Sequence, residues 1–282
     1  IIKFNYKLLN DVDIIFTALP NGEAQKISKK LLKKNILIDL AADFRLERVS
    51  DYVKWYKQKH KAPNLIKKSI YSLPELSGNK LKNYQIIGCP GCYPTSILLP
   101  LVPLLKKNFI KKNNIIIDSK SGYSGAGRGV HKKYKKKILY ESLSAYGVGF
   151  HRHNSEIEQI LNKYIKGKLE FTFTPHLSPM FRGILSTIYV DLSKGKTING
   201  LYNELIKFYK NSNFVNVVNL NSLLSTNNVI NTNNCEISVC KSKYNNKAII
   251  LSSIDNLIKG GAGQAIQNMN ILKNFEEHEG LR

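Results

Sequence analysis

Two short apolar runs on either side of a helical pattern constrain the fold of this chain more than any other feature. Residues 13–18 and 35–40 are typical of the buried strands of parallel sheets. Between them, residues 23–34 place apolar side chains at helical spacing along one side. Parallel strands joined through a helix require a right-handed crossover. The sequence therefore predicts an α/β domain with a doubly wound parallel sheet, whose ligands bind beyond the carboxyl ends of the strands.

A different pattern begins near residue 143, where strands alternate apolar and polar residues. Such strands favour a mixed or antiparallel sheet covered by helices on one face, an α+β arrangement. We expect the strands at residues 168–174, 183–191, 236–241 and 247–253, and helices at 156–165 (capped by Asn154 or Ser155), 198–209 and 261–272. The expected domains are residues 1–120, which bind a nucleotide, and residues 121–259, the α+β catalytic and dimerisation domain. The helix within 260–282 is expected to pack back on the first domain.

Cys92 lies where a buried strand is expected to turn into a helix. The strand ends at Ile87, and the helix is expected over residues 95–107, kinked or broken by Pro100 and Pro103. The unpaired N–H groups and positive end of a helix N-terminus favour an anion, so a thiol there ionises more easily and becomes a nucleophile. The alternative is that Cys92 is one small buried hydrophobe among four cysteines.

A nucleophilic cysteine needs an acid or base close to it in space, and His151 and His153 are the candidates. Arg152 lies between them and Glu156 follows, so this segment combines proton transfer with anion binding. The alternative is a polar loop whose histidines are satisfied by hydrogen bonds.

We do not predict a metal site. Cys89 and Cys92 have the C-x-x-C spacing of a zinc site, and Cys235 and Cys240 could complete four ligands. Residues five apart in a strand point to opposite faces, however, so Cys235 and Cys240 cannot readily chelate one ion. A thioredoxin-type redox pair at Cys89 and Cys92 lacks the expected aromatic flank.

Two segments rich in small residues follow predicted strands. The loop at residues 120–128 lets backbone approach a ligand closely, and residues 254–265 lead into a helix whose N-terminus could hold a phosphate or carboxamide. Tight packing of helix on sheet is the competing explanation for the second segment. No Gly-rich phosphate fingerprint precedes Asp13. Either the domain binds no dinucleotide, or its first units lie upstream of this chain.

The net charge of +23 is interpreted as a composition bias and not as a nucleic-acid site. The excess is mostly Lys, scattered with Asn and Ile as in proteins of AT-rich genomes, and the basic runs lack interleaved aromatic residues. The densest run, residues 131–137, is expected to be a solvated face. No apolar stretch is long enough to span a membrane, no signal peptide opens the chain, and four cysteines are too few for a disulfide scaffold. These features predict a cytoplasmic protein that binds small anions.

Several segments, in this order along nearly the whole chain, together resemble the N-acetyl-γ-glutamyl-phosphate reductases of arginine biosynthesis. They are Pro90–Thr95, Ser121–Arg128, His151–His153 with Glu156–Ile157, Phe173–Leu177 with Arg182–Leu185, and Asp255–Leu257 through Gln264–Ala265. The related aspartate-semialdehyde dehydrogenases share the chemistry but not these strings.

The resemblance implies a Rossmann-type domain that binds NADPH, a second domain that carries the acid or base, and an oligomer, often a homotetramer. It implies that the Cys92 thiolate attacks the acyl phosphate of N-acetyl-glutamyl phosphate to form a thioester, which NADPH reduces to the 5-semialdehyde. His151 would move the proton, with His153 as the second choice and Glu156 as the orienting carboxylate.

The resemblance also implies the binding residues. Arg152, Arg182 and Arg45 are candidates for the carboxylate and phosphate of the substrate, since Arg pairs bidentately with such groups. The cofactor-binding candidates are Ser124, Gly125 and Asn256 at the nicotinamide half, together with Pro20.

Three departures from the family pattern stand out. The family opens with a G-x-x-G-x-x-G turn that this chain lacks, so roughly 60 residues, two βα units, are expected to be missing. Ala41 stands where the family often has Ser, and Cys89 occupies a variable position, so we expect Cys89 to be a spectator. The alternatives are a related dehydrogenase that acts on aspartyl phosphate, or an inactive truncated remnant or basic protein that binds RNA.

Overall fold

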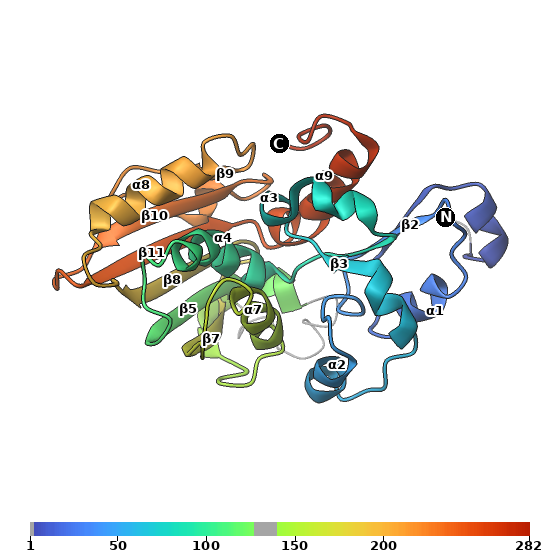
Figure 1. Cartoon of the computed structure of the whole chain (residues 1–282), viewed down its shortest axis with the longest axis horizontal. Helices are drawn as coiled ribbons and strands as arrows, with labels where there is room; N and C mark the ends of the chain where they lie inside the picture. The colour runs from blue at the N-terminus through green and yellow to red at the C-terminus, as the bar shows by residue number, and fades with distance from the viewer. Residues whose placement is uncertain (1–2, 127–139) are drawn as a thin grey trace. The chain divides into compact units, whose positions relative to one another are not determined.

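The computed structural model describes residues 3–126 and 140–282 of the 282-residue chain. The chain divides into two compact units (Figure 1): unit 1 is residues 1–91 and 261–281, and unit 2 is residues 92–260 together with Arg282. Helix α4 (Cys92–Lys106) and strand β5 (Ile115–Gly122) thus belong to unit 2. The expected domain boundary at residue 120 lies within β5, whereas the contacts divide the chain at Gly91. The basic run 131–137 and Arg128 lie outside the described residues.

Unit 1 is built on a four-stranded parallel sheet, which confirms the α/β prediction. Its strand order is β1-β2-β4-β3, and neighbouring strands run parallel throughout. The strands are β1 (Ile14–Thr17), β2 (Ile36–Asp39), β3 (Ser69–Tyr71) and β4 (Ile86–Gly88). The helical elements are η1 (Tyr6–Asn10), α1 (Glu23–Ser28), α2 (Val49–Tyr56), η2 (Pro63–Lys68), α3 (Pro74–Ser77), η3 (Gly78–Asn83) and α9 (Gly263–Lys273).

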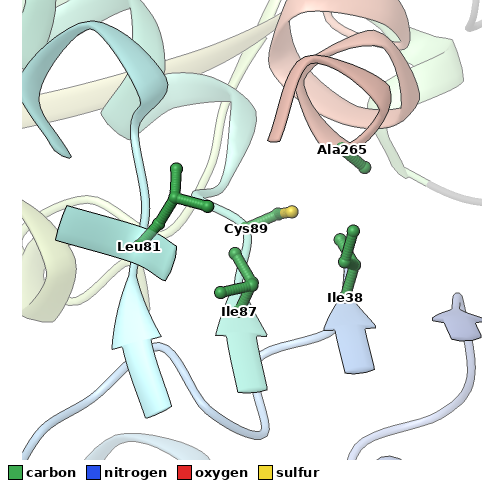
Figure 2. Close-up of a cluster of buried hydrophobic side chains, with 5 residues drawn as sticks. All are labelled: Ile38, Leu81, Ile87, Cys89 and Ala265. Carbon is green, nitrogen blue, oxygen red and sulfur yellow. The ribbon is translucent and has the colours of Figure 1, made fainter. Parts of the chain in front are cut away.

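A cluster of buried side chains joins this sheet to α9 (Figure 2). Ile38 and Ile87 project from neighbouring strands toward Ala265 of α9, and Leu81 and Cys89 lie beside them. Burial raises the pKa of the Cys89 thiol to about 12, so this thiol stays protonated. Cys89 therefore behaves as a small hydrophobe in the core of unit 1.

The start of α1 is fixed by a residue that follows the next strand. Asp43 is buried, and its carboxylate accepts hydrogen bonds from the main-chain nitrogens of Gly22 (2.6 Å) and Gln25 (3.2 Å). These are N–H groups that a helix cannot satisfy in its own first turn. The cap thus comes from tertiary structure, because Gly22 at the N-cap position has no side chain.

Helix α1 ends at Ser28, so the predicted helix over 23–34 is too long. The buried amide of Asn35 explains the difference. Its oxygen accepts from the Leu32 N–H (2.8 Å), and its nitrogen donates to the carbonyls of Leu9 and Val12. These bonds hold residues 29–34 in turns, as Asn side chains often do.

Unit 2 contains a seven-stranded mixed sheet of order β6-β7-β5-β8-β11-β10-β9. Strands β5 and β7 pair in parallel, as do β9 and β10, whereas the other neighbouring strands pair antiparallel. The sheet is therefore mixed, which confirms the expectation of a mixed or antiparallel sheet in this domain. The strands other than β5 are β6 (Ser144–Ala145), β7 (Phe171–Ser178), β8 (Ile184–Asp191), β9 (Val215–Val217), β10 (Cys235–Lys241) and β11 (Lys247–Ile254). The helices are α4, α7 (Asn154–Leu161) and α8 (Ile198–Tyr209), with short turns η4 (Tyr123–Ala126), η5 (Thr226–Asn228) and η6 (Ile258–Ala262), the last of which is π-helical.

Helix α4 is buried from Tyr93 to Leu105 and continues as one helix through Pro100 and Pro103. Of the two expected outcomes, a kink or a break, the break does not occur. It packs against β8, β11, α7 and α8 of its own unit. Pro103 cannot donate to the carbonyl of Leu99 four residues earlier. The hydroxyl of Tyr209, from α8, donates to that carbonyl at 2.6 Å. A distant side chain therefore replaces a hydrogen bond that the proline removes.

The predicted cap of α7 is also wrong. The N-cap residue is His153, and no side chain caps the helix. Asn154 instead donates to the Gly149 carbonyl, and Ser155 donates to the carbonyl of Arg152. Both side chains hold the loop that precedes the helix. Among the described residues, no helix has the length and apolar character needed to cross a membrane.

Asp39 lies fully buried at the end of β2. One of its oxygens, Oδ1, accepts from the Thr17 hydroxyl (2.7 Å) and from the Ala41 N–H (3.2 Å). Burial raises the pKa of this carboxyl to about 6, an effect larger than the opposing one of the Thr17 hydrogen bond. The folded chain therefore disfavours the ionised carboxylate.

We expect Asp39→Asn to stabilise the protein at pH 7.5 and to lose that advantage at pH 4. A pKa raised from 3.8 to about 6 corresponds to at most ~3 kcal/mol of folding free energy. The protonated carboxyl contributes this stability fully at pH values below the pKa of the unfolded chain. The contribution is lost as pH rises through the pKa of the folded chain, whereas the neutral Asn side chain does not titrate. Urea unfolding at both pH values measures the difference. Asp11→Asn, at an exposed carboxylate, is the matched control, and an Asp39→Asn variant that is less stable than wild type at pH 7.5 would contradict the prediction.

Candidate active site

Cys92 is the first residue of α4, as the strand-to-helix pattern predicted, and its side chain is half-buried. The fully buried continuation of α4 fixes the position of this first turn. Gly260, in the middle of η6, packs directly against it, because a Cβ at Gly260 would lie 2.6 Å from the Cys92 Cβ. The nucleophile candidate thus lies between a helix N-terminus and a close main-chain approach.

His151 is surrounded by four rings of unit 2, from helix α4, strand β7 and the loop between β6 and α7. The rings of Tyr93, Tyr146, His153 and Phe173 all meet it at steep angles, with centroid distances of 4.7–5.7 Å. The Nδ1 atom of His151 accepts a hydrogen bond from the His153 N–H at 3.2 Å. In the neutral ring the hydrogen is therefore carried by Nε2, since Nδ1 serves as the acceptor.

Burial lowers the pKa of His151 to about 4, and the positive charge of neighbouring Arg152 lowers it further in the same direction. The imidazole is consequently neutral at pH 7 and able to accept a proton. A neutral base near the nucleophile is what a thiol needs in order to ionise. Tyr93 connects the two groups, because it follows Cys92 in α4 and its ring lies against His151.

His153 and Glu156 form a second pair. The His153 Nε2 atom lies 3.8 Å from Oε1 of Glu156, whose side chain is fully buried. The carboxylate is therefore placed to orient His153, and His153 in turn donates through its N–H to His151. The structure brings together His151, His153 and Glu156; the roles assigned to them remain predictions.

Ser124, Gly125 and Asn256 also lie together. The buried Asn256 amide donates to the Ser124 hydroxyl at 3.0 Å and accepts from the Gly183 N–H at 2.7 Å. A Cβ on Gly125 would come within 3.2 Å of the Asn256 amide nitrogen, so a larger residue would crowd this polar surface. These residues fit the carboxamide end of a nicotinamide, which presents both a donor and an acceptor.

The three arginines have different environments. Arg152 is exposed beside His151. Arg182 is half-buried, and its guanidinium lies 3.4 Å from the Asp255 carboxylate and donates to Asn231. Arg45, in unit 1, is buried and donates to the main-chain carbonyls of Cys89 and Leu40. Its recorded hydrogen bonds thus hold the ends of strands β4 and β2.

Pro20, the remaining cofactor candidate, is an exposed residue of the turn between β1 and α1 in unit 1. Its carbonyl accepts from the Glu23 N–H. The substrate and cofactor roles of Pro20 and the arginines remain predictions.

Sequence reasoning missed Tyr93, Tyr146 and Gly260 as parts of this site. Tyr93 is adjacent to Cys92 and Tyr146 is five residues before His151, but neither spacing signals that the two hydroxyls bond to each other. Gly260 lies within a segment that the sequence had singled out, although its packing against Cys92 depends on the fold.

Two family models match the chain. The semialdehyde dehydrogenase NAD binding domain matches residues 2–84, and the semialdehyde dehydrogenase dimerisation domain matches residues 92–256.

Curated relatives are similar over nearly the whole chain. An N-acetyl-gamma-glutamyl-phosphate reductase of Clostridium botulinum is 46% identical, over 98% of this chain and 80% of the relative. That of Clostridium beijerinckii is 48% identical over the same shares. A probable chloroplastic reductase of Arabidopsis thaliana is 46% identical over 96% of this chain and 67% of its own.

Solved structures show the same fold at low sequence identity. Aspartate semialdehyde dehydrogenase II of Vibrio cholerae is 14% identical with a TM-score of 0.69, over 96% of this chain and 82% of that one. The Francisella tularensis enzyme is 16% identical with a TM-score of 0.70, over 96% and 84%. This likeness supports the combination of a Rossmann-type parallel sheet and a mixed-sheet domain.

We expect Gly260→Ala to displace Cys92 and change the reactivity of its thiol. The added methyl group would overlap the Cys92 side chain, and overpacking of this kind typically costs 1–3 kcal/mol. The measurement is the rate of iodoacetamide alkylation at Cys92, followed by peptide mass analysis, with a change of roughly fivefold expected from a shift of about 1 kcal/mol.

Gly195→Ala is the matched control. Gly195 has a left-handed φ of +75°, but no atom lies within 4 Å of the place that a Cβ would take, so alanine strains the backbone without touching the site. Equal alkylation rates in wild type and Gly260→Ala would show that the close contact does not position Cys92.

Proposed function

Because the chain belongs to the N-acetyl-gamma-glutamyl-phosphate reductases of the semialdehyde dehydrogenase family, we propose that it reduces N-acetyl-L-glutamyl 5-phosphate to N-acetyl-L-glutamate 5-semialdehyde in arginine biosynthesis. One observation carries this proposal beyond the likeness of sequence. Cys92 begins a buried helix, and the residue that follows it packs against a histidine that is neutral at pH 7. Nucleophile and base are thus supplied by one unit of the chain.

The reaction begins with proton transfer from the Cys92 thiol to the imidazole of His151. The thiolate attacks the acyl carbon of the substrate, a carbon–sulfur bond forms, and the carbon–oxygen bond to phosphate breaks. Phosphate leaves and a thioester remains on Cys92. The positive end of α4 stabilises the thiolate before attack.

NADPH, when bound, supplies the hydride that reduces the thioester carbon. The hemithioacetal on Cys92 then collapses, the carbon–sulfur bond breaks, and the aldehyde leaves. The expelled thiolate recovers a proton from His151, which returns the site to its starting state. Covalent catalysis of this kind splits one difficult step into two easier ones.

Cofactor binding is assigned to both units. The family model for residues 2–84 is an NAD binding domain, and residues 14–88 form the parallel sheet expected of one. We assign the nicotinamide carboxamide to Asn256, Ser124 and the open backbone of Gly125, on the donor and acceptor pattern described above. We also propose that Pro20, in unit 1, contacts the cofactor.

Substrate binding is assigned to Arg152, Arg182 and Arg45. Arg152 has the most direct support, since it is exposed beside His151 and raises the local positive potential. Arg182 keeps part of its charge balanced by Asp255, so it suits a carboxylate better than a phosphate dianion. Arg45 also has a structural role, because its guanidinium donates hydrogen bonds to the main-chain carbonyls that follow strands β4 and β2.

We also propose a homo-oligomer that forms through one face of the seven-stranded sheet. Helices α4 and α8 contact the sheet through alternate, buried residues of its strands. The other residues point to the opposite face, where Ile116 is 50% and Tyr189 is 41% exposed, and Leu185, Ile249 and Leu251 are half-buried. The same face also carries Thr187 and the ion pair of Asp118 and Lys120 (2.7 Å). An exposed face that is apolar around Ile116 and Tyr189 indicates an interface, and the matching family model is a dimerisation domain.

Location in the cytoplasm is part of the same proposal. All four cysteines are free thiols, which is the state expected in a reducing compartment. Two of them, Cys89 and Cys235, are buried, so they are protected from oxidation in any case. Cell fractionation tests the location directly.

We expect Cys92→Ser to abolish reductase activity while leaving the fold intact. The loss should be on the order of 10³-fold or more, because the attacking group itself is removed. The assay is phosphate-dependent reduction of NADP with N-acetyl-glutamate 5-semialdehyde, followed by absorbance. Cys240→Ser, at the other half-buried cysteine, is the matched control and should keep activity within twofold.

Two outcomes would contradict the proposal. Full activity of Cys92→Ser would exclude the thioester route. Activity with aspartate semialdehyde and none with the N-acetyl compound would assign the chain to the other substrate.

Tyr189→Lys is expected to convert the oligomer to a monomer. A lysine on this face would be desolvated by the partner, and the carboxylate of Asp118 on the paired strand β5 is already engaged by Lys120 and His176. Light scattering coupled to size exclusion measures the mass. Tyr244→Lys, at an exposed tyrosine of the β10–β11 turn, should leave the mass unchanged, and an unchanged mass for Tyr189→Lys would exclude this face.

A further inference from the structure

Tyr146 is the partly exposed member of the ring cluster around His151. It directly follows the short edge strand β6, and its N–H donates to the Pro175 carbonyl of neighbouring β7 at 3.1 Å. Its ring meets the imidazole of His151 at a centroid distance of 5.4 Å and an angle of 74°. The side chain is 36% exposed, so one side of the ring faces water while the other covers the histidine.

The hydroxyl of Tyr146 bonds to a buried partner that also contacts His151. It donates to the Tyr93 hydroxyl at 3.0 Å, and Tyr93 in turn donates to the His176 carbonyl at 3.3 Å. Tyr93 is only 2% exposed, and its ring lies against His151, His153 and Phe173. The two tyrosines therefore hold His151 between them through one hydroxyl–hydroxyl bond.

Gly147 brings the same segment close to the backbone of His151. Its φ is +57°, a left-handed conformation that favours glycine. A Cβ at this position would lie 3.1 Å from His151 Cδ2 and 3.4 Å from His151 Cα. Tyr146 thus contacts the imidazole through its ring, and Gly147 packs closely against the backbone and side chain of the same histidine.

We propose that Tyr146 is a positioning residue for His151, holding the imidazole against Tyr93 and excluding water from it. The inference rests on the proposed function, in which His151 exchanges a proton with Cys92. Tyr146 touches neither Cys92 nor the reacting carbon in this role. It acts through the hydroxyl of Tyr93 and through its own ring.

The charged and titratable groups that face His151 determine how its pKa should change when the Tyr146 ring is removed. Arg152 is adjacent in the chain, Tyr93 and Tyr146 supply the flanking rings, and His153, with Glu156 beyond it, donates to Nδ1. Burial is the main cause of the lowered pKa of His151, and Tyr146 supplies part of that burial. Removing its ring should admit water and raise the pKa toward the ordinary value of 6.5. The base would then be protonated, and inactive, at a higher pH than in wild type.

The experiment compares Tyr146→Phe and Tyr146→Ala in the phosphate-dependent assay across pH. For Tyr146→Phe, which loses only the hydroxyl bond, kcat should fall roughly fivefold while the acidic limb of kcat/KM stays in place. For Tyr146→Ala, the acidic limb should move up by about one pH unit or more, because the imidazole becomes solvated. Tyr209→Phe removes a buried tyrosine hydroxyl bond at α8 and is the matched control, expected to leave the limb unchanged.

NMR titration of the His151 imidazole gives a readout independent of activity. The resonance is assigned by its loss in His151→Gln, and its pKa should be higher in Tyr146→Ala than in wild type. Tyr146→Leu replaces Tyr146→Ala if the alanine variant does not fold, and it should shift the pKa in the same direction by less.

Equal imidazole pKa values in wild type and in both ring-removal variants would overturn the inference. A wild-type protein with no reductase activity, but with the expected pKa shift, would instead refute the proposed function and leave the positioning role standing.

Discussion

The burial of helix α4 is the constraint on which the rest of unit 2 depends. Every side chain from Tyr93 to Leu105 is withdrawn from solvent, so the helix cannot slide or rotate without breaking the core. Its first turn, which carries Cys92, is consequently held as rigidly as its middle. A nucleophile at the end of an exposed helix would fray with the terminus, whereas the buried turns of α4 anchor this one.

Because α4 is buried, each of its main-chain carbonyls needs a hydrogen-bond donor from within the protein. Two prolines within the helix each remove a main-chain donor, and an unsatisfied carbonyl inside a protein costs roughly 1–3 kcal/mol. At Leu99 the requirement is met by the hydroxyl of Tyr209, a residue 110 positions later in the chain. Helix α8 therefore stabilises α4 through a specific polar bond as well as through apolar packing.

Buried titratable side chains are stabilised in different ways in the two units. In unit 1, buried Asp43 is satisfied by two main-chain N–H groups, while burial raises the pKa of Asp39 and makes its ionised form costly in the folded chain. In unit 2, His151 is kept neutral among aromatic rings, which provide a low dielectric without adding charge. A carboxylate next to His151 would raise the pKa of its imidazole. The carboxylate of Glu156 lies beside His153 instead.

The sequence by itself determined the parallel sheet of unit 1, most strands and helices of unit 2, and the place of Cys92 at a helix start, because each depends on local apolar periodicity. The resemblance carried by its motifs also led to the right family. Only the tertiary structure decided that α4 runs unbroken, that Asn35 ends α1 early, that β7 lies parallel to β5, and that Tyr93 and Tyr146 enclose His151. In each of these cases a side chain or strand is satisfied by a partner from another element of the fold. Such partners leave no periodic signal in the sequence, because any residue able to donate, accept or pack could have met the same requirement.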